Sequence, residues 1–200
     1  LGILSTPNNI YGAVDEALRL SDAAVDWTPF DQNRDGVVDM LWVVHSGLGG
    51  ENTVLRDNLW SVTSTMSSWS RGSAFVTNDR VPGGGGLYMR IERFSMLPEL
   101  SGHRTGMPAE IGVYCHEFGH ALGLPDLFDT SGISRNLGPG NWSLMSTGGT
   151  GGDGQSPESP VHIGGWASVC MGWSPMIRVT RDTSLAVAAF PYPYRAQLLT

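Results

Sequence analysis

Residues 116–126 read HEFGHALGLPD and contain the pattern HExxH, extended to HExxHxxGxxD. Side chains four positions apart on a helix lie on the same face, one turn above the other. His116 and His120 can therefore offer two imidazoles to a single metal ion. Glu117 lies about 100° round the helix from His116, so it can hold a water molecule on that metal without being a ligand itself.

The residues that follow His120 predict a sharp end to this helix. Gly123 allows the chain to leave the helix, and Pro125 prevents the helix from continuing. Asp126 can then turn back as the third ligand, with Asp129 as the fallback. We expect the helix to begin near Pro108, which suits a first turn. Heptad-like spacing predicts that its buried face carries Ile111, Cys115, Phe118 and Leu122.

A second motif, DQNRDGVVD, occupies residues 31–39. It matches the DxNxDGxxD opening of an EF-hand calcium loop, with Gly36 where the chain must turn sharply. The predicted calcium ligands are the side chains of Asp31, Asn33, Asp35 and Asp39 and the carbonyl of Val37. An EF-hand has a bidentate Glu at loop position 12, but Trp42 stands there. The last ligand then comes from elsewhere, with Glu51 one candidate, or the site is weak; a solvated turn is the alternative.

Length and charge restrict the class of protein. Two hundred residues suit one domain, and the net charge of −7 argues against nucleic-acid and anionic-membrane partners. The sequence contains no run of 18 apolar residues, so no segment is predicted to insert into a membrane. Residues 1–7 lack the features of a signal peptide, so we expect the chain to start inside a larger precursor. Cys115 and Cys170 could pair, although a buried free thiol is the simpler interpretation of Cys115.

Hydrophobic periodicity predicts a mixture of helices and strands. We expect a helix from Asn8 or Asn9 to about Val25, which Asn9 could cap, and a central strand at the apolar run 40–44. Further strands are expected at 59–62, 74–77, 87–94, 177–180 and 184–189, and a helix at 161–173. The strand at 87–94 is also a candidate for pairing with a substrate backbone.

The predicted fold class is α+β. It has a mixed twisted sheet, a backing helix and the active-site helix, followed by an irregular C-terminal subdomain. We expect a catalytic domain over residues 1–180. Residues 181–200 are expected to be either the start of a truncated C-terminal region or the last strands of the same domain.

Four motifs, in this order, resemble the immune inhibitor A family of secreted bacterial zinc metallopeptidases, which is related to the metzincins. The first is the loop 31–39 with the apolar strand and His45-Ser46-Gly47 after it, and the second is the block 116–126. The third is residues 141–145, NWSLM, and the fourth is the segment 160–173. Together they span about residues 25 to 175. The resemblance implies a metzincin-like or zincin-like catalytic domain and an extracellular location.

The resemblance also implies roles for single residues. His116 and His120 match zinc ligands, Glu117 matches the general base, and Asp126 stands where most metzincins have a third histidine. Met145 matches the Met-turn, an apolar shelf beneath the zinc ligands. The calcium-like loop of the family matches residues 31–39. No Tyr stands two residues after Met145, so the oxyanion-supporting tyrosine of some metzincins is not carried over.

The predicted function is that of a secreted zinc-dependent endopeptidase. It would hydrolyse peptide bonds through a zinc-bound water activated by Glu117. The expected cofactors are Zn²⁺ and Ca²⁺, and the expected partner is a protein or peptide substrate. Two alternatives stay open, a non-catalytic binding or adhesion module on the same fold and a zinc hydrolase of amides outside proteins. Ordinary hydrogen bonds are expected of the other histidines, His45, His103 and His162.

Overall fold

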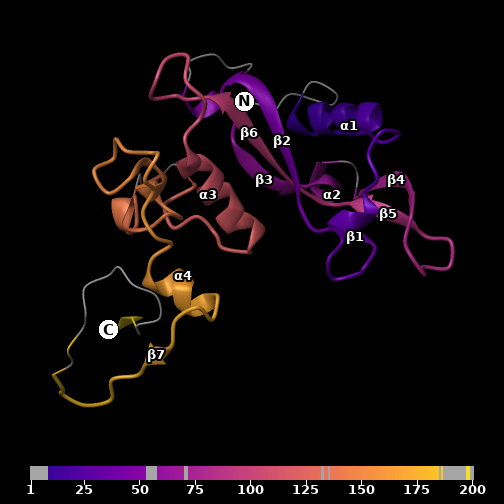
Figure 1. Ribbon diagram of the computed structural model, residues 1–200. Coiled ribbons are helices and arrows are strands. Elements are labelled where there is room, and N and C mark those ends of the chain that lie inside the picture. Colours follow the sequence, from indigo (N-terminus) through magenta and orange to yellow (C-terminus); the bar gives the residue numbers. More distant parts are fainter. Residues whose placement is uncertain are drawn as a thin grey trace. The chain divides into compact units, whose positions relative to one another are not determined.

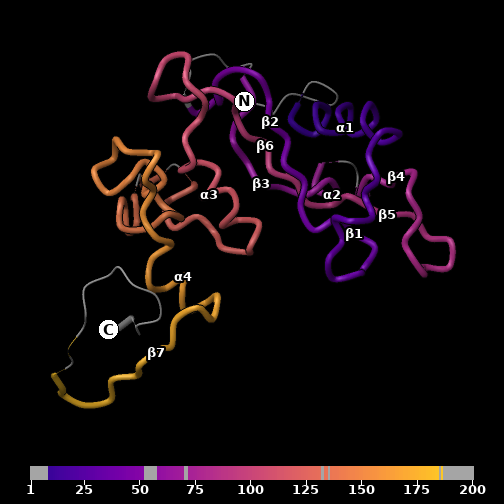
Figure 2. Tube along the Cα trace, in the orientation of Figure 1, coloured from indigo at the N-terminus to yellow at the C-terminus, as the bar shows by residue number. Residues whose placement is uncertain are grey.

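The structure is a computed structural model that describes residues 9–52, 58–69, 72–131, 133–134, 136–184, 186 and 197–198. The chain divides into two compact units, the first ending at Gly123 and the second beginning at Leu124. Figure 1 shows its helices and strands, and Figure 2 traces the same path through the Cα atoms. The domain boundary expected near residue 180 stays a prediction.

The first unit contains two three-stranded sheets. One has the order β1-β5-β4 and consists of β1 (Val37–Val38), β5 (Tyr88–Ile91) and β4 (Phe75–Arg80). The other has the order β2-β6-β3 and consists of β2 (Leu41–Leu48), β6 (Arg93–Leu100) and β3 (Val62–Thr65). In each sheet one neighbour of the central strand is parallel to it and the other is antiparallel. The predicted α+β class with mixed strand directions is confirmed, although the strands form two small sheets.

Two predictions about strand position were wrong. The apolar run 40–44 predicts a central strand, but β2 is an edge strand of its described sheet and alternates between half-buried and exposed residues. The segment 87–94 is not one strand, because it divides at Glu92 into β5 and the start of β6. Both β5 and β6 are paired on both sides, so this segment has no free backbone edge to offer a substrate.

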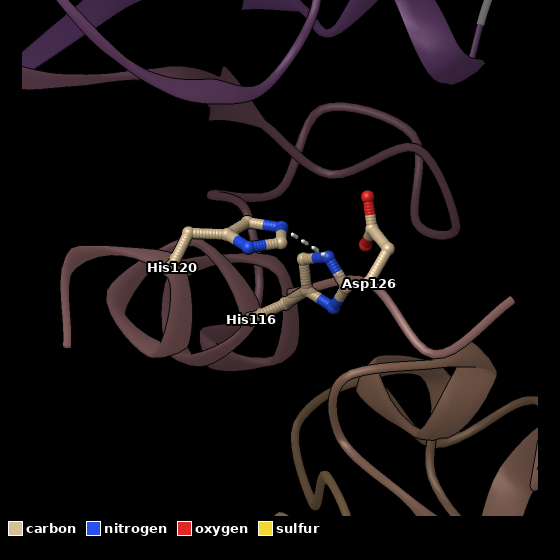
Figure 3. A group of neighbouring side chains, drawn as sticks. All are labelled: His116, His120 and Asp126. Carbon is tan, nitrogen blue, oxygen red and sulfur yellow. Dashed lines mark hydrogen bonds between the residues drawn. The ribbon is translucent and has the colours of Figure 1, made fainter. Parts of the chain in front are cut away.

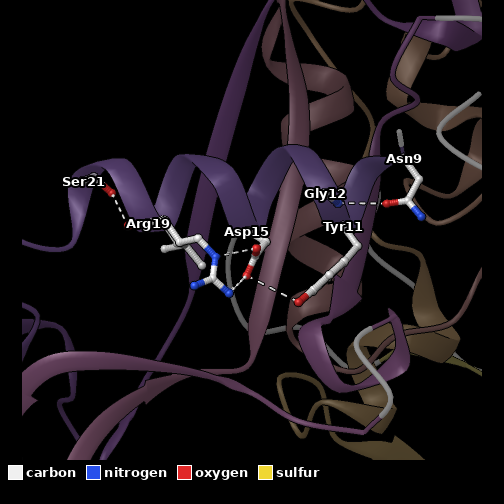
Figure 4. A network of polar contacts seen from close by, with 7 residues as sticks. Asn9, Tyr11, Gly12, Asp15, Arg19 and Ser21 are labelled. Carbon is white, nitrogen blue, oxygen red and sulfur yellow. Dashed lines mark hydrogen bonds and ion pairs between the residues drawn. The ribbon is translucent and has the colours of Figure 1, made fainter. Parts of the chain in front are cut away.

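Helix α1 (Ile10–Ser21) begins where the sequence predicts but ends before Val25, at Ser21. The amide of Gly12 donates to Asn9 Oδ1 at 2.8 Å, which confirms the cap. The buried face of α1 carries Ile10, Val14 and Leu18, and these residues join a core that includes Met89, Ile91, Phe94 and Met96. Beside this face Arg19 pairs with Asp15 at 2.7 Å, and the Tyr11 hydroxyl donates to the same carboxylate (Figure 4).

Helix α3 (Ile111–Ala121) carries the HExxH pattern and begins later than expected. Pro108 forms an isolated bridge with Leu100, and the amide of Ala109 donates to the Glu99 carbonyl at 2.8 Å. These contacts hold the residues before Ile111 extended alongside the end of β6, so the helix cannot start at Pro108.

The predicted buried face of α3 was also wrong. Ile111, Phe118 and Leu122 are 55%, 45% and 37% exposed. The side that contacts the sheet instead carries Tyr114, whose hydroxyl donates to the Pro98 carbonyl at 2.7 Å. The Trp42 ring of β2 lies 5.6 Å from that of Tyr114 and 6.1 Å from that of Phe118. One face of β2 thus contacts the helix through Trp42, while Leu41 and Val43 of the other face pack against the core.

The second unit is largely irregular, as predicted. It contains the 3₁₀ turns η3 (Gly140–Trp142) and η4 (Thr147–Thr150), the short helix α4 (Gly165–Cys170), and the parallel pair β7 (Met176–Ile177) and β8 (Gln197–Leu198). The helix expected at 161–173 is thus shorter, and the strand expected at 184–189 lies largely outside the described residues.

Three short elements complete the first unit, η1 (Thr28–Phe30), η2 (Gly50–Asn52) and α2 (Met66–Trp69). Strands β3 and β4 are the counterparts of the strands expected at 59–62 and 74–77, each displaced toward the C-terminus. Over the described residues, no helix has the length and apolar character that crossing a membrane requires.

Candidate active site

The two histidines of the HExxH pattern converge from successive turns of α3. His116 Nε2 and His120 Nε2 lie 3.1 Å apart, joined by the dashed line in Figure 3. Two nitrogens that each lie about 2.05 Å from one tetrahedral zinc ion are roughly 3.3 Å apart. The spacing in α3 therefore fits two ligands of one metal ion.

Asp126 brings a carboxylate to the same place. One ligand atom from each of His116, His120 and Asp126 lies within 4.8 Å of the others, and Figure 3 shows the three side chains together. Among the residues that the structure describes, these three form the one group of His, Cys, Asp or Glu side chains whose ligand atoms lie this close together. Two imidazole nitrogens and one carboxylate oxygen are a donor set that suits zinc.

The chain reaches Asp126 through the predicted sharp exit. The amide of Gly123 donates to the His120 carbonyl at 2.9 Å, and Gly123 has φ = +95°, a left-handed conformation that favours glycine. One local turn thus connects the last histidine to the segment that carries the carboxylate.

Met145 lies in the second unit, where its backbone contacts the residue after Asp126. The Leu127 amide donates to the Met145 carbonyl at 2.7 Å, and the Met145 side chain is fully buried. The same unit joins two of the sequence motifs, because the Leu144 amide donates to the His162 carbonyl at 2.8 Å and Ser143 Oγ donates to the Ile163 carbonyl at 2.8 Å. Nothing in the local sequence signals these pairings.

Asp129, the fallback ligand, is engaged by its own loop. The hydroxyls and amides of Ser131 and Ser134 all donate to its carboxylate. Hydrogen bonds from the Ser131 side chain and then from Ser134 hold the pKa of Asp129 well below its ordinary value. This carboxylate caps a turn, and Asp126 is the acidic residue that joins the two histidines.

Glu117 follows His116 on α3 and is only 5% exposed. Its backbone carbonyl accepts a hydrogen bond from Thr63 Oγ1 of β3 at 2.8 Å. One turn later, the Ala121 carbonyl accepts one from Arg93 Nη1 of β6, also at 2.8 Å. Sequence reasoning missed Thr63 and Arg93, because neither lies in a motif.

The loop 31–39 has the sharp turn that was expected, with Gly36 at φ = +82°. Its carboxylates accept hydrogen bonds from the loop itself: Asp31 from the Asp35 and Gly36 amides, Asp35 from Asn33 and the Val37 amide, and Asp39 from the Gln32 amide. These are the contacts of an Asp-rich turn and do not by themselves support calcium. Glu51, the suggested extra ligand, accepts hydrogen bonds from the Ser61 amide and hydroxyl.

His45, His103 and His162 lie outside the one metal-competent group found among the described residues. His45 Nδ1 lies 3.0 Å from the neighbouring Ser46 carbonyl, a local contact of the kind expected, and the His103 amide donates to Ser101 Oγ. Cys115 is half-buried, Cys170 is exposed, and both are free thiols.

A family model described as "Immune inhibitor A peptidase M6, catalytic domain" matches residues 26–171. The match covers well over half of the chain and includes the loop 31–39, the block 116–126 and Met145. The chain belongs to the immune inhibitor A peptidase family. The resemblance inferred from the four motifs is thereby confirmed.

Individual relatives agree with this assignment. Immune inhibitor A from Bacillus thuringiensis subsp. alesti is 30% identical over 163 residues, which make up 71% of this chain and 22% of the relative. The pre-pro-metalloprotease PrtV of Vibrio cholerae serotype O1, from strains M66-2 and ATCC 39315, is 29% identical over 136 residues, or 66% of this chain and 14% of PrtV. The chain thus spans about a fifth or less of the length of these relatives. The family and its named relatives support the broad class of metallopeptidase.

Proposed function

We propose that this chain is the catalytic part of a zinc-dependent endopeptidase. The observation that carries the proposal is the convergence of His116, His120 and Asp126 within 4.8 Å in a chain of the immune inhibitor A family. Three protein ligands leave a fourth tetrahedral position open, which is the arrangement of catalytic zinc sites; structural sites use four protein ligands. Zinc in this position would polarise a peptide carbonyl and lower the pKa of water.

Glu117 has the role of general base in this proposal. It is adjacent to His116 in the sequence and lies outside the group of proposed ligands, so it would act as a base and not as a ligand. It would take a proton from the attacking water and pass that proton to the leaving amine when the peptide bond breaks. Burial of Glu117 favours this role, since a site that excludes bulk water keeps the proton on the reacting groups.

Met145 and Asp129 would have supporting roles. The Leu127–Met145 backbone bond fixes the chain immediately after Asp126, and the buried Met145 side chain would give that turn an apolar base. Asp129 would keep the loop after Asp126 in shape through Ser131 and Ser134. An extracellular protein or peptide is the proposed substrate, by analogy with the family.

Calcium at residues 31–39 is a second, separate proposal. It is supported by the positive φ of Gly36 and by the oxygen atoms at Asp31, Asn33, Asp35, Val37 and Asp39. If calcium binds there, millimolar Ca²⁺ should raise the melting temperature of the wild type and leave that of Asp35→Ala unchanged. Equal responses from the two proteins would remove this loop as a calcium site.

Cleavage of casein by the zinc-loaded chain tests the main proposal, with Glu117→Gln as the matched variant. Gln has the shape of Glu and cannot accept the proton, so we expect similar zinc content and a rate lower by about 10²- to 10⁴-fold. If neither protein cleaves casein while both hold zinc, the result would favour the alternative of a binding module. A panel of small amides separates the remaining alternative, a zinc hydrolase whose substrates are not proteins.

A further inference from the structure

Strand β3 is bonded directly to the backbone of the catalytic helix. Thr63 Oγ1 donates to the Glu117 carbonyl at 2.8 Å across a sequence separation of 54 residues. A carbonyl oxygen has two lone pairs, and in the middle of a helix one of them normally receives the amide four residues later. Thr63 therefore adds a second donor to a backbone group inside α3.

The direction of the neighbouring hydrogen bond follows from the first. Thr63 Oγ1 also lies 2.6 Å from Ser95 Oγ, and the two residues are partners in the β3–β6 register. A carbonyl can only accept, so the single hydroxyl proton of Thr63 goes to Glu117. Ser95, which is fully buried, must then donate to Thr63. The two bonds form one chain from β6 through β3 to α3, and successive hydroxyl donors strengthen each other.

The packing of α3 shows why these two hydrogen bonds matter for the position of the helix. The apolar residues expected to anchor the helix, Ile111, Phe118 and Leu122, are exposed. The sheet contacts α3 through the Trp42 ring, which lies against Tyr114 and Phe118, and through three hydrogen bonds: Tyr114 with the Pro98 carbonyl, Arg93 with the Ala121 carbonyl and Thr63 with the Glu117 carbonyl. Of these, only the Thr63 contact is made at the residue to which the proposed mechanism assigns proton transfer.

We infer that Thr63 is a positioning residue that fixes the place of Glu117 beside the sheet. This inference rests on the proposed function, since it gives Glu117 the role of base. Without the Thr63 hydroxyl, α3 keeps its internal hydrogen bonds. It loses the contact that fixes its position along β3 and its rotation about its own axis at Glu117. Misalignment of a base slows the chemical step more than it weakens substrate binding.

Three variants separate the hydroxyl from simple packing. Thr63→Val keeps the shape and removes the hydroxyl, Thr63→Ser keeps the hydroxyl, and Thr65→Val is the matched control. Thr65 is on the same face of β3, and its hydroxyl contacts Ser68 Oγ at 2.6 Å. We expect Thr63→Val to lower kcat by about tenfold with KM within about twofold of wild type. Thr63→Ser and Thr65→Val should both stay within about twofold in kcat.

A second measurement needs neither zinc nor substrate. Hydrogen–deuterium exchange over α3 should be faster in Thr63→Val than in Thr65→Val, because α3 has lost one of its ties to the sheet. Equal exchange in these two variants, or a Thr63→Ser variant as impaired as Thr63→Val, would overturn the inference. An inactive wild type that holds zinc would refute the proposed function, and the exchange data would still decide whether Thr63 holds the helix.

Thr63→Val leaves the buried Ser95 hydroxyl without its acceptor, which can impair folding. The double variant Thr63→Val/Ser95→Ala removes both polar groups, and replacing both partners by apolar groups can be nearly neutral for stability. If the single variant does not fold, the double variant should fold and show the same tenfold loss in kcat. Wild-type kcat in the folded double variant would equally overturn the inference.

Discussion

The two parts of the segment 116–126 are held in place by different means. His116 and His120 lie on a regular helix, so their spacing is a property of any α-helix. Asp126 lies after the turn at Gly123, and the amide of the next residue, Leu127, is bonded to the Met145 carbonyl. A helix positions ligands through local geometry, whereas an irregular segment needs a partner far along the chain. The helical ligands should therefore tolerate changes in distant residues better than Asp126 does.

Loss of a helical ligand should have the largest effect. We expect His120→Ala to abolish stable zinc binding and to lower casein cleavage by at least about 10³-fold, because two ligands cannot hold zinc as three do. Metal content after dialysis and cleavage rate measure the two effects. His103→Ala is the control, since the contact found for His103 uses its backbone amide. Zinc content equal to that of wild type in His120→Ala would contradict the assignment of this ligand.

Exchange of the loop carboxylate should have a smaller effect. We expect Asp126→Asn to weaken zinc binding on the order of 100-fold, because the amide is a poorer and uncharged ligand. Asp129→Asn should leave zinc affinity within about twofold of wild type, since Asp129 is engaged by Ser131 and Ser134. Chelator competition gives both affinities. If instead Asp129→Asn weakened zinc binding and Asp126→Asn did not, Asp129 would be the third ligand.

The turn between the two parts can be tested through stability. Gly123 has φ = +95°, and a Cβ there would meet no atom within 4 Å. The cost of an Ala at this position is therefore backbone strain and not a steric clash. We expect Gly123→Ala to cost about 1 to 2 kcal/mol, seen as a melting temperature lower by about 2 to 8 °C. Gly152→Ala is the control, because its Cβ would make an ordinary contact of 3.7 Å with Val161. An unchanged melting temperature in Gly123→Ala would mean that the turn relaxes without strain.

The smallest effect concerns the two thiols. Burial raises the pKa of Cys115 on α3, so at a given pH its thiolate fraction is lower, whereas Cys170 is exposed. We expect iodoacetamide at pH 8 to modify Cys170 several times faster than Cys115. Peptide mass spectrometry of the reduced protein measures both rates. Faster reaction at Cys115 would mean that α3 opens readily.

The parts of the fold that could be predicted are those set by neighbours in the sequence. The Asn9 cap, the convergence of His116 with His120 and the sharp exit at Gly123 each depend on a few consecutive residues. The start of α3 was missed because a bridge between Leu100 and Pro108 keeps the chain extended, and that bridge joins residues on two different segments.

The buried face of α3 could not be predicted for a related reason. Apolar periodicity reports side-chain burial, but two of the contacts that hold this helix are made to its carbonyl groups, which every residue has and no sequence pattern marks. The edge position of β2 was missed because apolar residues such as Trp42 are equally suited to packing against a helix.

The way in which α3 is held also bears on how this sequence can diverge. Because the sheet contacts the helix backbone, the outward residues Ile111 and Leu122 can be exchanged for polar ones without moving the histidines. Besides the motif itself, we expect selection for catalysis to act on Thr63 and Arg93 of the neighbouring strands, whose side chains bond to the helix. Relatives of this chain should therefore vary freely along the exposed face of the helix and change little at those two strand positions.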